Sequence, residues 1–146
     1  LGMPGLGGIG TLKSLIALKT DVRVLISSGM KELAEVGEKI ASEHLRSKGH
    51  TILNRRYRYD RAEVDIVSES GGMLVFTEVK TRESSYLTEP IQLVPLKKQR
   101  QLIKAADGYL KERNEERPSR FDIIIIVHNT EYTRIDHIED AFYPTI

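Results

Sequence analysis

Two acidic residues and a lysine stand on either side of a glycine pair, in an arrangement that could bind a metal ion. The first acid is Asp65, and the second begins the run Glu78-Val79-Lys80. Because side chains of a β-strand alternate between its two faces, Glu78 and Lys80 share one face. Gly71-Gly72 predicts a two-residue hairpin loop, and counting back along both strands places Asp65 opposite Glu78. The same register places Glu63 opposite Lys80.

Opposed carboxylates are costly in a strand pair, because their Cβ atoms lie about 5 Å apart and like charges repel. A divalent cation between Asp65 and Glu78 would remove that cost, and Mg²⁺ or Mn²⁺ takes oxygen ligands of this kind. A neighbouring backbone carbonyl and waters would complete the coordination. Lys80 could stabilise charge that develops on a phosphate, or orient the attacking water. We therefore expect Asp65 and Glu78 to bind the metal and Lys80 to act in catalysis.

The same charged residues permit a second interpretation, an ion-pair ladder on the surface with no catalytic role. It would pair Lys80 with the acids Glu63, Asp65 and Glu78. Apolar residues of both strands share the faces of these acids, which indicates that this side is at least partly covered. We therefore favour a site over a surface ladder.

The elements predicted around these residues are two helices and five strands. The helices cover residues 31–48 and about 95–112, and the strands cover residues 51–57, 63–68, 73–81, 121–127 and 132–138. The strand over 121–127 is apolar without alternation, which is typical of a central strand covered on both faces, and the last strand is a weaker edge strand. This order predicts an α/β fold with a central mixed sheet flanked by helices and an αβββαβ core.

The first helix offers one more acid to this region. Its apolar residues recur at helical spacing and form one stripe, which includes His44. A lone histidine in such a stripe is more often a packed ring than a ligand. Glu38 falls at the rim of the stripe, so it is the acid of this helix that could reach a site at the edge of the core.

Residues 1–29 differ in composition from the rest of the chain, with several glycines in the first ten positions. A phosphate-binding loop is disfavoured there because no strand precedes the glycines and no paired acid follows at the right distance. We expect an N-terminal extension, flexible or helical, over residues 1–29 and a single domain over residues 30–146.

Composition excludes several classes of protein. The chain of 146 residues has no cysteine, so it has neither disulfides nor Cys-ligated zinc or iron–sulfur sites. No uninterrupted apolar run approaches the ~20 residues of a membrane helix. We expect a soluble, cytoplasmic protein without a membrane partner.

Basic residues gather in two segments although the formal net charge is only +1. Local patches of this kind can neutralise phosphates, and the alternative is that they are solvated faces. The residues that we expect to contact nucleic acid, together with one arginine near the lysine of the site, are Arg55, Arg58, Arg82, Lys97, Lys98, Arg100 and Lys104.

Asp65 and the run from Glu78 to Lys80 resemble the D…(D/E)XK signature of the PD-(D/E)XK nuclease superfamily, with Val64 where a proline is usual. More narrowly, the chain resembles the YraN family (UPF0102), bacterial proteins similar to archaeal Holliday-junction resolvases. The matching segments are Gly37-Glu38 with Ala41 and Leu45, Asn54 and Arg58, residues 63–67, residues 75–82, Lys98 with Leu102, Ala106 and Leu110, and Arg120-Phe121-Asp122.

The resemblance covers about residues 36–142 and implies a restriction-endonuclease-like fold. It implies that Asp65 and Glu78 bind metal, that Lys80 is catalytic and that Glu38 approaches the metal from the first helix. Supporting roles are implied for Arg82, Lys98 and Asp122. The chain departs from the family pattern at Ala62, where glycine is usual, and at residues 88–90, both of which are predicted loops.

The leading hypothesis is a Mg²⁺- or Mn²⁺-dependent nuclease that acts on nucleic acid, with DNA favoured, by in-line attack of a metal-activated water. Lys80, Glu38 and Glu63 are the expected catalytic residues. A second hypothesis is a non-catalytic nucleic-acid-binding module on the same fold. A third is a protein-interaction domain that forms a homodimer through the apolar part of residues 1–29.

Overall fold

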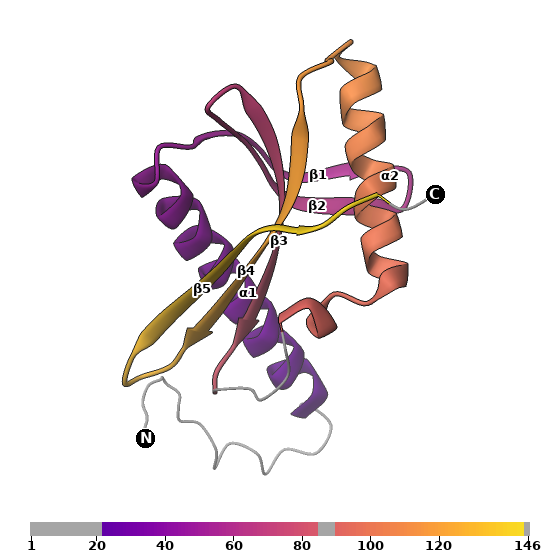
Figure 1. Cartoon of the computed structure of the whole chain (residues 1–146). Helices are drawn as coiled ribbons and strands as arrows, with labels where there is room; N and C mark the ends of the chain where they lie inside the picture. The colour runs from indigo at the N-terminus through magenta and orange to yellow at the C-terminus, as the bar shows by residue number, and fades with distance from the viewer. Residues whose placement is uncertain (1–21, 85–89, 145–146) are drawn as a thin grey trace.

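Five strands form one sheet, and helices cover both of its faces (Figure 1). The computed structural model describes residues 22–84 and 90–144. The elements are α1 (Val22–Ser47), β1 (Thr51–Tyr59), β2 (Ala62–Ser70), β3 (Met73–Arg82), the short 3-10 helix η2 (Pro90–Leu93), α2 (Leu96–Glu112), β4 (Ser119–His128) and β5 (Thr133–Phe142). The predicted α/β class is confirmed, and the architecture is consistent with a restriction-endonuclease-like fold.

The strands are hydrogen-bonded in the order β1-β2-β3-β4-β5. The β3–β4 pair is parallel and the other pairs are antiparallel, so the sheet is mixed. Because α2 lies between β3 and β4 along the chain, it provides the crossover that a parallel pair requires. The run from Phe121 to Val127 is buried in an internal strand, which confirms the predicted cover on both faces, although β3 and not β4 is the central strand. The last strand, β5, is an edge strand as predicted.

Residues of β4 alternate between two apolar clusters. Ile123 and Ile125 belong to the cluster that contains Leu102 of α2. Ile124 belongs to the cluster that contains Leu45 of α1. Because neighbouring residues of a strand point to opposite faces, the two helices cover opposite faces of the sheet, an arrangement visible in Figure 1.

The hairpin between β2 and β3 has the predicted two-residue loop. Ser70 pairs with Met73, and the pairing continues to Ile66 opposite Thr77. The loop residues Gly71-Gly72 have φ angles of 57° and 79°. Glycine adopts this left-handed conformation without steric cost, and it matches the twist of the flanking strands. The predicted register is therefore confirmed from Ser70–Met73 as far as Ile66–Thr77, where the ladder ends.

The β1–β2 hairpin changes face partway along its length. Ile66 packs in the cluster of α1, whereas Val64 packs in the cluster of α2, although strict alternation would keep both on one face. The ladder pairs Arg55 with Ile66 and Tyr57 with Val64, and Arg56 between them has a φ of 52°. This left-handed conformation costs a non-glycine residue about 1–2 kcal/mol. The turn of the backbone at Arg56 thus allows the end of the hairpin to reach α2.

Helix α1 begins at Val22 and continues across residue 30, the predicted start of the domain. The glycine-rich run lies outside the described residues, as do the rest of residues 1–21 and residues 85–89. Neither helix within the described ranges has the apolar length that a bilayer crossing would need.

Gly37 brings α1 into direct contact with β3, and its replacement provides a test of this packing. A Cβ at this position would lie 2.8 Å from Cγ2 of Thr81 and closer still to its Oγ1. We expect Gly37→Ala to lower the free energy of unfolding by about 1–3 kcal/mol, because the helix must move away from the strand.

Gly29→Ala is the matched control for that measurement. It lies in the same helix, and a Cβ there would meet nothing within 4 Å. Its replacement should raise stability by roughly 0.5–1 kcal/mol through helix propensity alone. Urea denaturation of both variants decides the point, and equal stability of the two would contradict the close packing of α1 on β3.

Candidate active site

The two predicted metal ligands lie where β2 and β3 separate. The ladder between these strands ends at Ile66 opposite Thr77, so Asp65 and Glu78 are the first residues beyond it. Oδ2 of Asp65 accepts a hydrogen bond of 2.8 Å from the backbone N–H of Val79. The side chain of Asp65 therefore closes the end of the ladder by binding the backbone of β3.

Glu78 lies at the centre of a group of charges. Its side chain is only 5% exposed, and its Oε2 lies 3.2 Å from Nζ of Lys80. Nζ of Lys98 approaches the same oxygen from α2 to 4.0 Å. Oε1 of Glu78 has no hydrogen-bond partner among the described residues. Because a buried carboxylate oxygen without a donor is costly, this atom is suited to receive a proton or a cation.

Asp65 is strongly affected by its surroundings. Burial and the negative charge of Glu78 raise the pKa of Asp65 to about 8, and the hydrogen bond from Val79 offsets this only in part. The two carboxyl groups also lie within hydrogen-bonding reach of each other. At neutral pH without a cation, the Asp65–Glu78 pair therefore keeps one proton, since two charged carboxylates would repel here. A divalent cation could replace that proton and neutralise both groups.

The donor set at this position fits a hard divalent cation. Within residues 22–84 and 90–144 there is no group of three or more acidic or histidine side chains that could hold a metal ion. A Mg²⁺ or Mn²⁺ ion at this position would have Asp65 and Glu78 as its side-chain ligands, with backbone carbonyl and water oxygens completing the coordination. The unpartnered Oε1 of Glu78 and the raised pKa of Asp65 both support this fit.

Glu38 is buried on α1 and contributes to raising the pKa of Asp65. Its Oε1 accepts a hydrogen bond of 2.9 Å from Nε of Arg56 and lies 3.8 Å from Nη2 of Arg55. The acid is therefore close to Asp65 but engaged by two arginines of β1. The ion pair also holds Arg56 at the point where the β1–β2 hairpin changes face.

Glu63 does not join this group. It pairs with Arg58 across the β1–β2 hairpin, with Oε2 of Glu63 3.0 Å from Nε of Arg58. The ladder between β2 and β3 ends before Glu63, and the described ion pair of Lys80 is with Glu78. The expectation that Glu63 lies opposite Lys80 is therefore wrong, because the hairpin has already turned toward α2 at this point.

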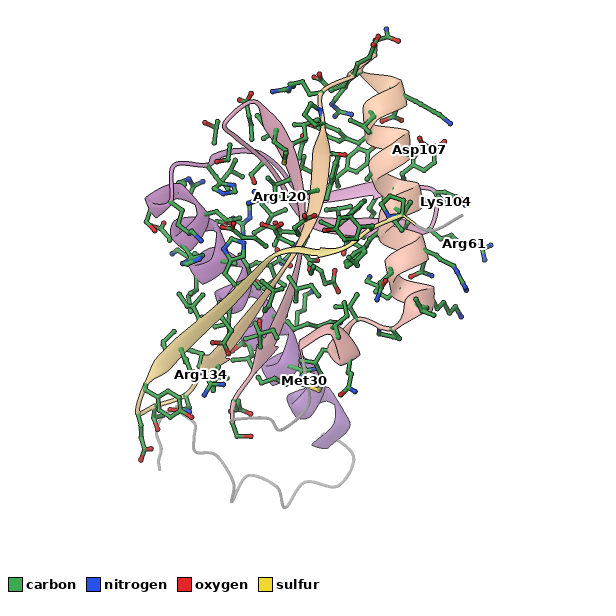
Figure 2. The ribbon with its side chains drawn as sticks, in the orientation of Figure 1. Met30, Arg61, Lys104, Asp107, Arg120 and Arg134 are labelled. Carbon is green, nitrogen blue, oxygen red and sulfur yellow. The ribbon has the colours of Figure 1, made fainter. Side chains whose placement is uncertain are left out.

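The predicted nucleic-acid-binding residues differ in how they are engaged. Three are paired with acids: Arg55 with Glu38, Arg58 with Glu63, and Lys104 with Asp60. Figure 2 shows Lys104 on the outer side of α2, near Arg61 of the β1–β2 turn. Arg82 donates a hydrogen bond to the backbone oxygen of Thr81, and Lys98 faces Glu78. Lys97 and Arg100 are exposed at the start of α2, without an acidic partner among the described side chains.

A second polar group was not recognised from the residues alone. Asp122 is fully buried in β4, where it binds Arg120 and His137. His44, interpreted as a packed ring, contacts His137. The sequence feature that could have indicated this group is an acid within an otherwise apolar strand, because a buried acid requires buried partners.

The Asp65–Glu78 pair predicts a dependence of stability on pH in EDTA. The pKa of Asp65 is raised from 3.8 to about 8, so its contribution is complete below pH 3.8 and is lost as pH rises toward 8. Asp65→Asn removes this titration. Its melting temperature relative to wild type should therefore increase from pH 4 to pH 8, and millimolar Mg²⁺ should stabilise wild type far more than the variant.

Glu63→Gln is the control, because this acid carries only an ion pair with an exposed arginine. It should change stability by less than about 1 kcal/mol. If Asp65→Asn is instead less stable than wild type in every buffer, the acids form a structural ion-pair ladder and not a metal site.

Comparison with known proteins identifies the family of this chain. Residues 37–126 match the family described as "Uncharacterised protein family UPF0102". A UPF0102 protein of Christiangramia forsetii is 44% identical over 112 residues, which cover 77% of this chain and 94% of the relative. Similar proteins of Bacteroides thetaiotaomicron (39% over 115 residues, 79% and 95%) and Flavobacterium johnsoniae (42% over 116 residues, 77% and 94%) carry the same name. The matched region contains Asp65, Glu78 and Lys80, and the chain belongs to the UPF0102 family.

Proposed function

We propose that the protein is a Mg²⁺- or Mn²⁺-dependent nuclease that hydrolyses phosphodiester bonds of nucleic acid, with DNA as the favoured substrate. The observation that carries this proposal is the buried Asp65–Glu78 pair, with Lys80 3.2 Å from Glu78. Its position at the diverging ends of β2 and β3, and the D…EXK spacing, support membership of the PD-(D/E)XK superfamily. The likeness to archaeal Holliday-junction resolvases makes branched DNA a substrate to test.

Each residue of the site has a proposed part in this reaction. The bound cation would supply Lewis acidity and lower the pKa of a water molecule. Asp65 and Glu78 hold it, and the N–H of Val79 keeps Asp65 oriented. The ammonium of Lys80 can donate to a phosphate oxygen as negative charge develops there. Glu38 lies close enough to influence Asp65, and its arginine partners fix its position.

The start of α2 is the proposed contact with the phosphate backbone. Lys98 points toward Glu78, and Lys97 and Arg100 in the same turn are exposed without acidic partners among the described residues. A cation without an acidic partner binds a phosphate at a lower cost in free energy than a cation that must first break an ion pair with a carboxylate. We therefore place the phosphate contacts at Lys97 and Arg100 ahead of Arg58 and Lys104, and leave Lys98 with its partner Glu78.

A non-catalytic module for nucleic-acid or protein binding is the alternative. The pairing of Arg55, Arg58 and Lys104 with acids favours a protein-binding module, since these residues carry less free charge for phosphates than their number indicates. The buried acid pair counts against it, because two adjacent carboxyl groups with a raised pKa are costly and cluster at catalytic sites.

Cleavage is tested with linear, flapped and four-way-junction DNA and with single-stranded RNA, in Mg²⁺ and in Mn²⁺. Glu78→Gln and Lys80→Ala should each reduce the rate roughly 1,000-fold, since each removes several kcal/mol of transition-state stabilisation. Binding should change little, and Glu63→Gln should cleave at the wild-type rate. Tight binding by wild type without cleavage in any combination would support the non-catalytic module.

Salt dependence tests the binding surface separately. The logarithm of the binding constant for duplex DNA should fall with the logarithm of salt concentration, with a slope of about −0.9 for each phosphate contact. Lys97→Ala combined with Arg100→Ala should make the slope shallower by about 1.8, whereas Lys104→Ala, whose lysine pairs with Asp60, should change it less. An unchanged slope in the double variant would place the phosphates elsewhere.

A further inference from the structure

The buried carboxylate of Asp122 organises a polar cluster outside the candidate active site. Its side chain is fully buried and accepts hydrogen bonds from Nε and Nη2 of Arg120, at 2.9 and 3.2 Å. It also accepts from Nε2 of His137 at 2.8 Å and from the backbone N–H of Asp140 at 3.0 Å. These donors lower the pKa of Asp122, although burial opposes them. The group is therefore a carboxylate and not a carboxylic acid.

This set of partners defines the protonation of two histidine rings. Because Asp122 only accepts, Nε2 of His137 must carry a hydrogen. In the neutral ring Nδ1 is then an acceptor, and Nε2 of His44 lies 3.1 Å from it. His44 therefore donates through Nε2, and a chain of hydrogen bonds runs from α1 through β5 to β4.

Positive charges surround the pair of rings. Nζ of Lys48, the residue directly after α1, lies 3.4 Å from Nδ1 of His137 and 3.0 Å from Oε2 of Glu139 of β5. Arg120 lies between β4 and the C-terminal end of α1 in Figure 2. The ring of His50, which bonds Oγ of Ser68 at 2.9 Å, is centred 6.5 Å from that of His137.

The hydrogen bond between the two rings is compatible with one protonated ring but not with two. If one ring is an imidazolium, it donates to the unprotonated nitrogen of the other, and the hydrogen bond survives. If both are imidazolium, two N–H groups point at each other across 3.1 Å, beside Lys48 and Arg120. Asp122 contacts Nε2 of His137 and can stabilise an imidazolium there, but among the described residues no carboxylate bonds to the ring of His44 to offset a second charge.

We propose that the His44–His137 pair is an acid-sensitive clamp that holds the C-terminal half of α1 on the sheet and opens when both rings are protonated. The clamp is separate from the proposed nuclease chemistry and does not rest on it. It is connected to the same elements, because His137 pairs with Ile124 and Ile124 pairs with Val79 of β3. The helix that it holds also carries Glu38, so its release would disturb the candidate site.

The direction of the pH dependence follows from the pKa shifts of His44 and His50. Burial lowers the pKa of His44 below 6.5, and the charges of His137, Lys48 and His50 lower it further. Burial and Arg120 lower the pKa of His50 in the same way. The unfolded chain therefore binds these protons more readily, so stability is complete above pH 6.5 and is lost as pH falls below it.

His44→Gln tests the clamp, because the amide nitrogen of glutamine can replace Nε2 as a donor but cannot be protonated. The full-length protein is unfolded in urea at intervals from pH 8 to pH 5, in EDTA. We expect the proton uptake on unfolding between pH 6.5 and 5 to fall by about one in the variant. His50 and Asp65 titrate in both proteins, so they do not affect this difference.

His128→Gln is the matched control, since this half-buried histidine at the end of β4 bonds only Thr133 among the described residues. It should leave the proton uptake unchanged. An uptake in His44→Gln equal to that of wild type, or an equal loss in His128→Gln, would overturn the proposal.

Titration of the wild-type rings by nitrogen-detected NMR covers the case in which His44→Gln does not fold. A clamp requires that the two rings titrate in separate steps, and that the amide signals of α1 shift at the second step and not at the first. Independent titration of both rings near pH 6.5, with no change along α1, would overturn the proposal as well.

Discussion

The burial of two adjacent carboxyl groups is the constraint on which the rest of this structure depends. Burial and the charge of Glu78 raise the pKa of Asp65, so ionising both groups is costly and the surrounding elements must hold them together. The strand register brings the two acids together. The N–H of Val79 donates a hydrogen bond to Asp65, and lysines of β3 and α2 form ion pairs with Glu78. Buried acid pairs with a raised pKa lower stability, and they are found at functional sites more often than elsewhere in proteins.

The backbone of Arg56, close to the acid pair, is a second unfavourable feature. Arg56 adopts a left-handed backbone conformation where β1 passes Asp65, and its side chain binds Glu38 of α1. Backbone strain of this kind persists only when the surroundings enforce it, and here the ion pair to α1 does so. The first helix is thus fixed to the edge of the site through Glu38 and to the far part of the sheet through His44. These two attachments, together with the close contact of Gly37, explain how one helix could influence the whole candidate site.

The features that the sequence predicted correctly depend on residues close together along the chain. Two glycines with alternating flanks specify a hairpin and its register, so the opposition of Asp65 and Glu78 follows from counting residues. The continuous apolar run of β4 similarly identifies a strand covered on both faces. These features depend on neighbours along the chain, and the described strands match the predicted ones within a few residues.

Tertiary pairing explains what the sequence could not predict. The misplacement of Glu63 results from the turn at Arg56, where no glycine or proline marks the unusual backbone. The partners of the basic residues come from distant segments, as Lys104 and Asp60 illustrate. His44 could not be recognised as part of a cluster because its partner His137 is 93 residues away.

The two-residue loop between β2 and β3 also limits how this protein can change in length. Exposed hairpin tips usually tolerate inserted residues. One additional residue on the β2 side of Gly71-Gly72, however, would slide one strand past the other by a single position and turn every side chain of β2 to the opposite face. Asp65 would then point away from Glu78, although the insertion lies at the far end of the hairpin. An insertion in this loop would therefore harm the site as much as the replacement of Asp65 or Glu78. A large distance from the site does not show that a position can accept an insertion.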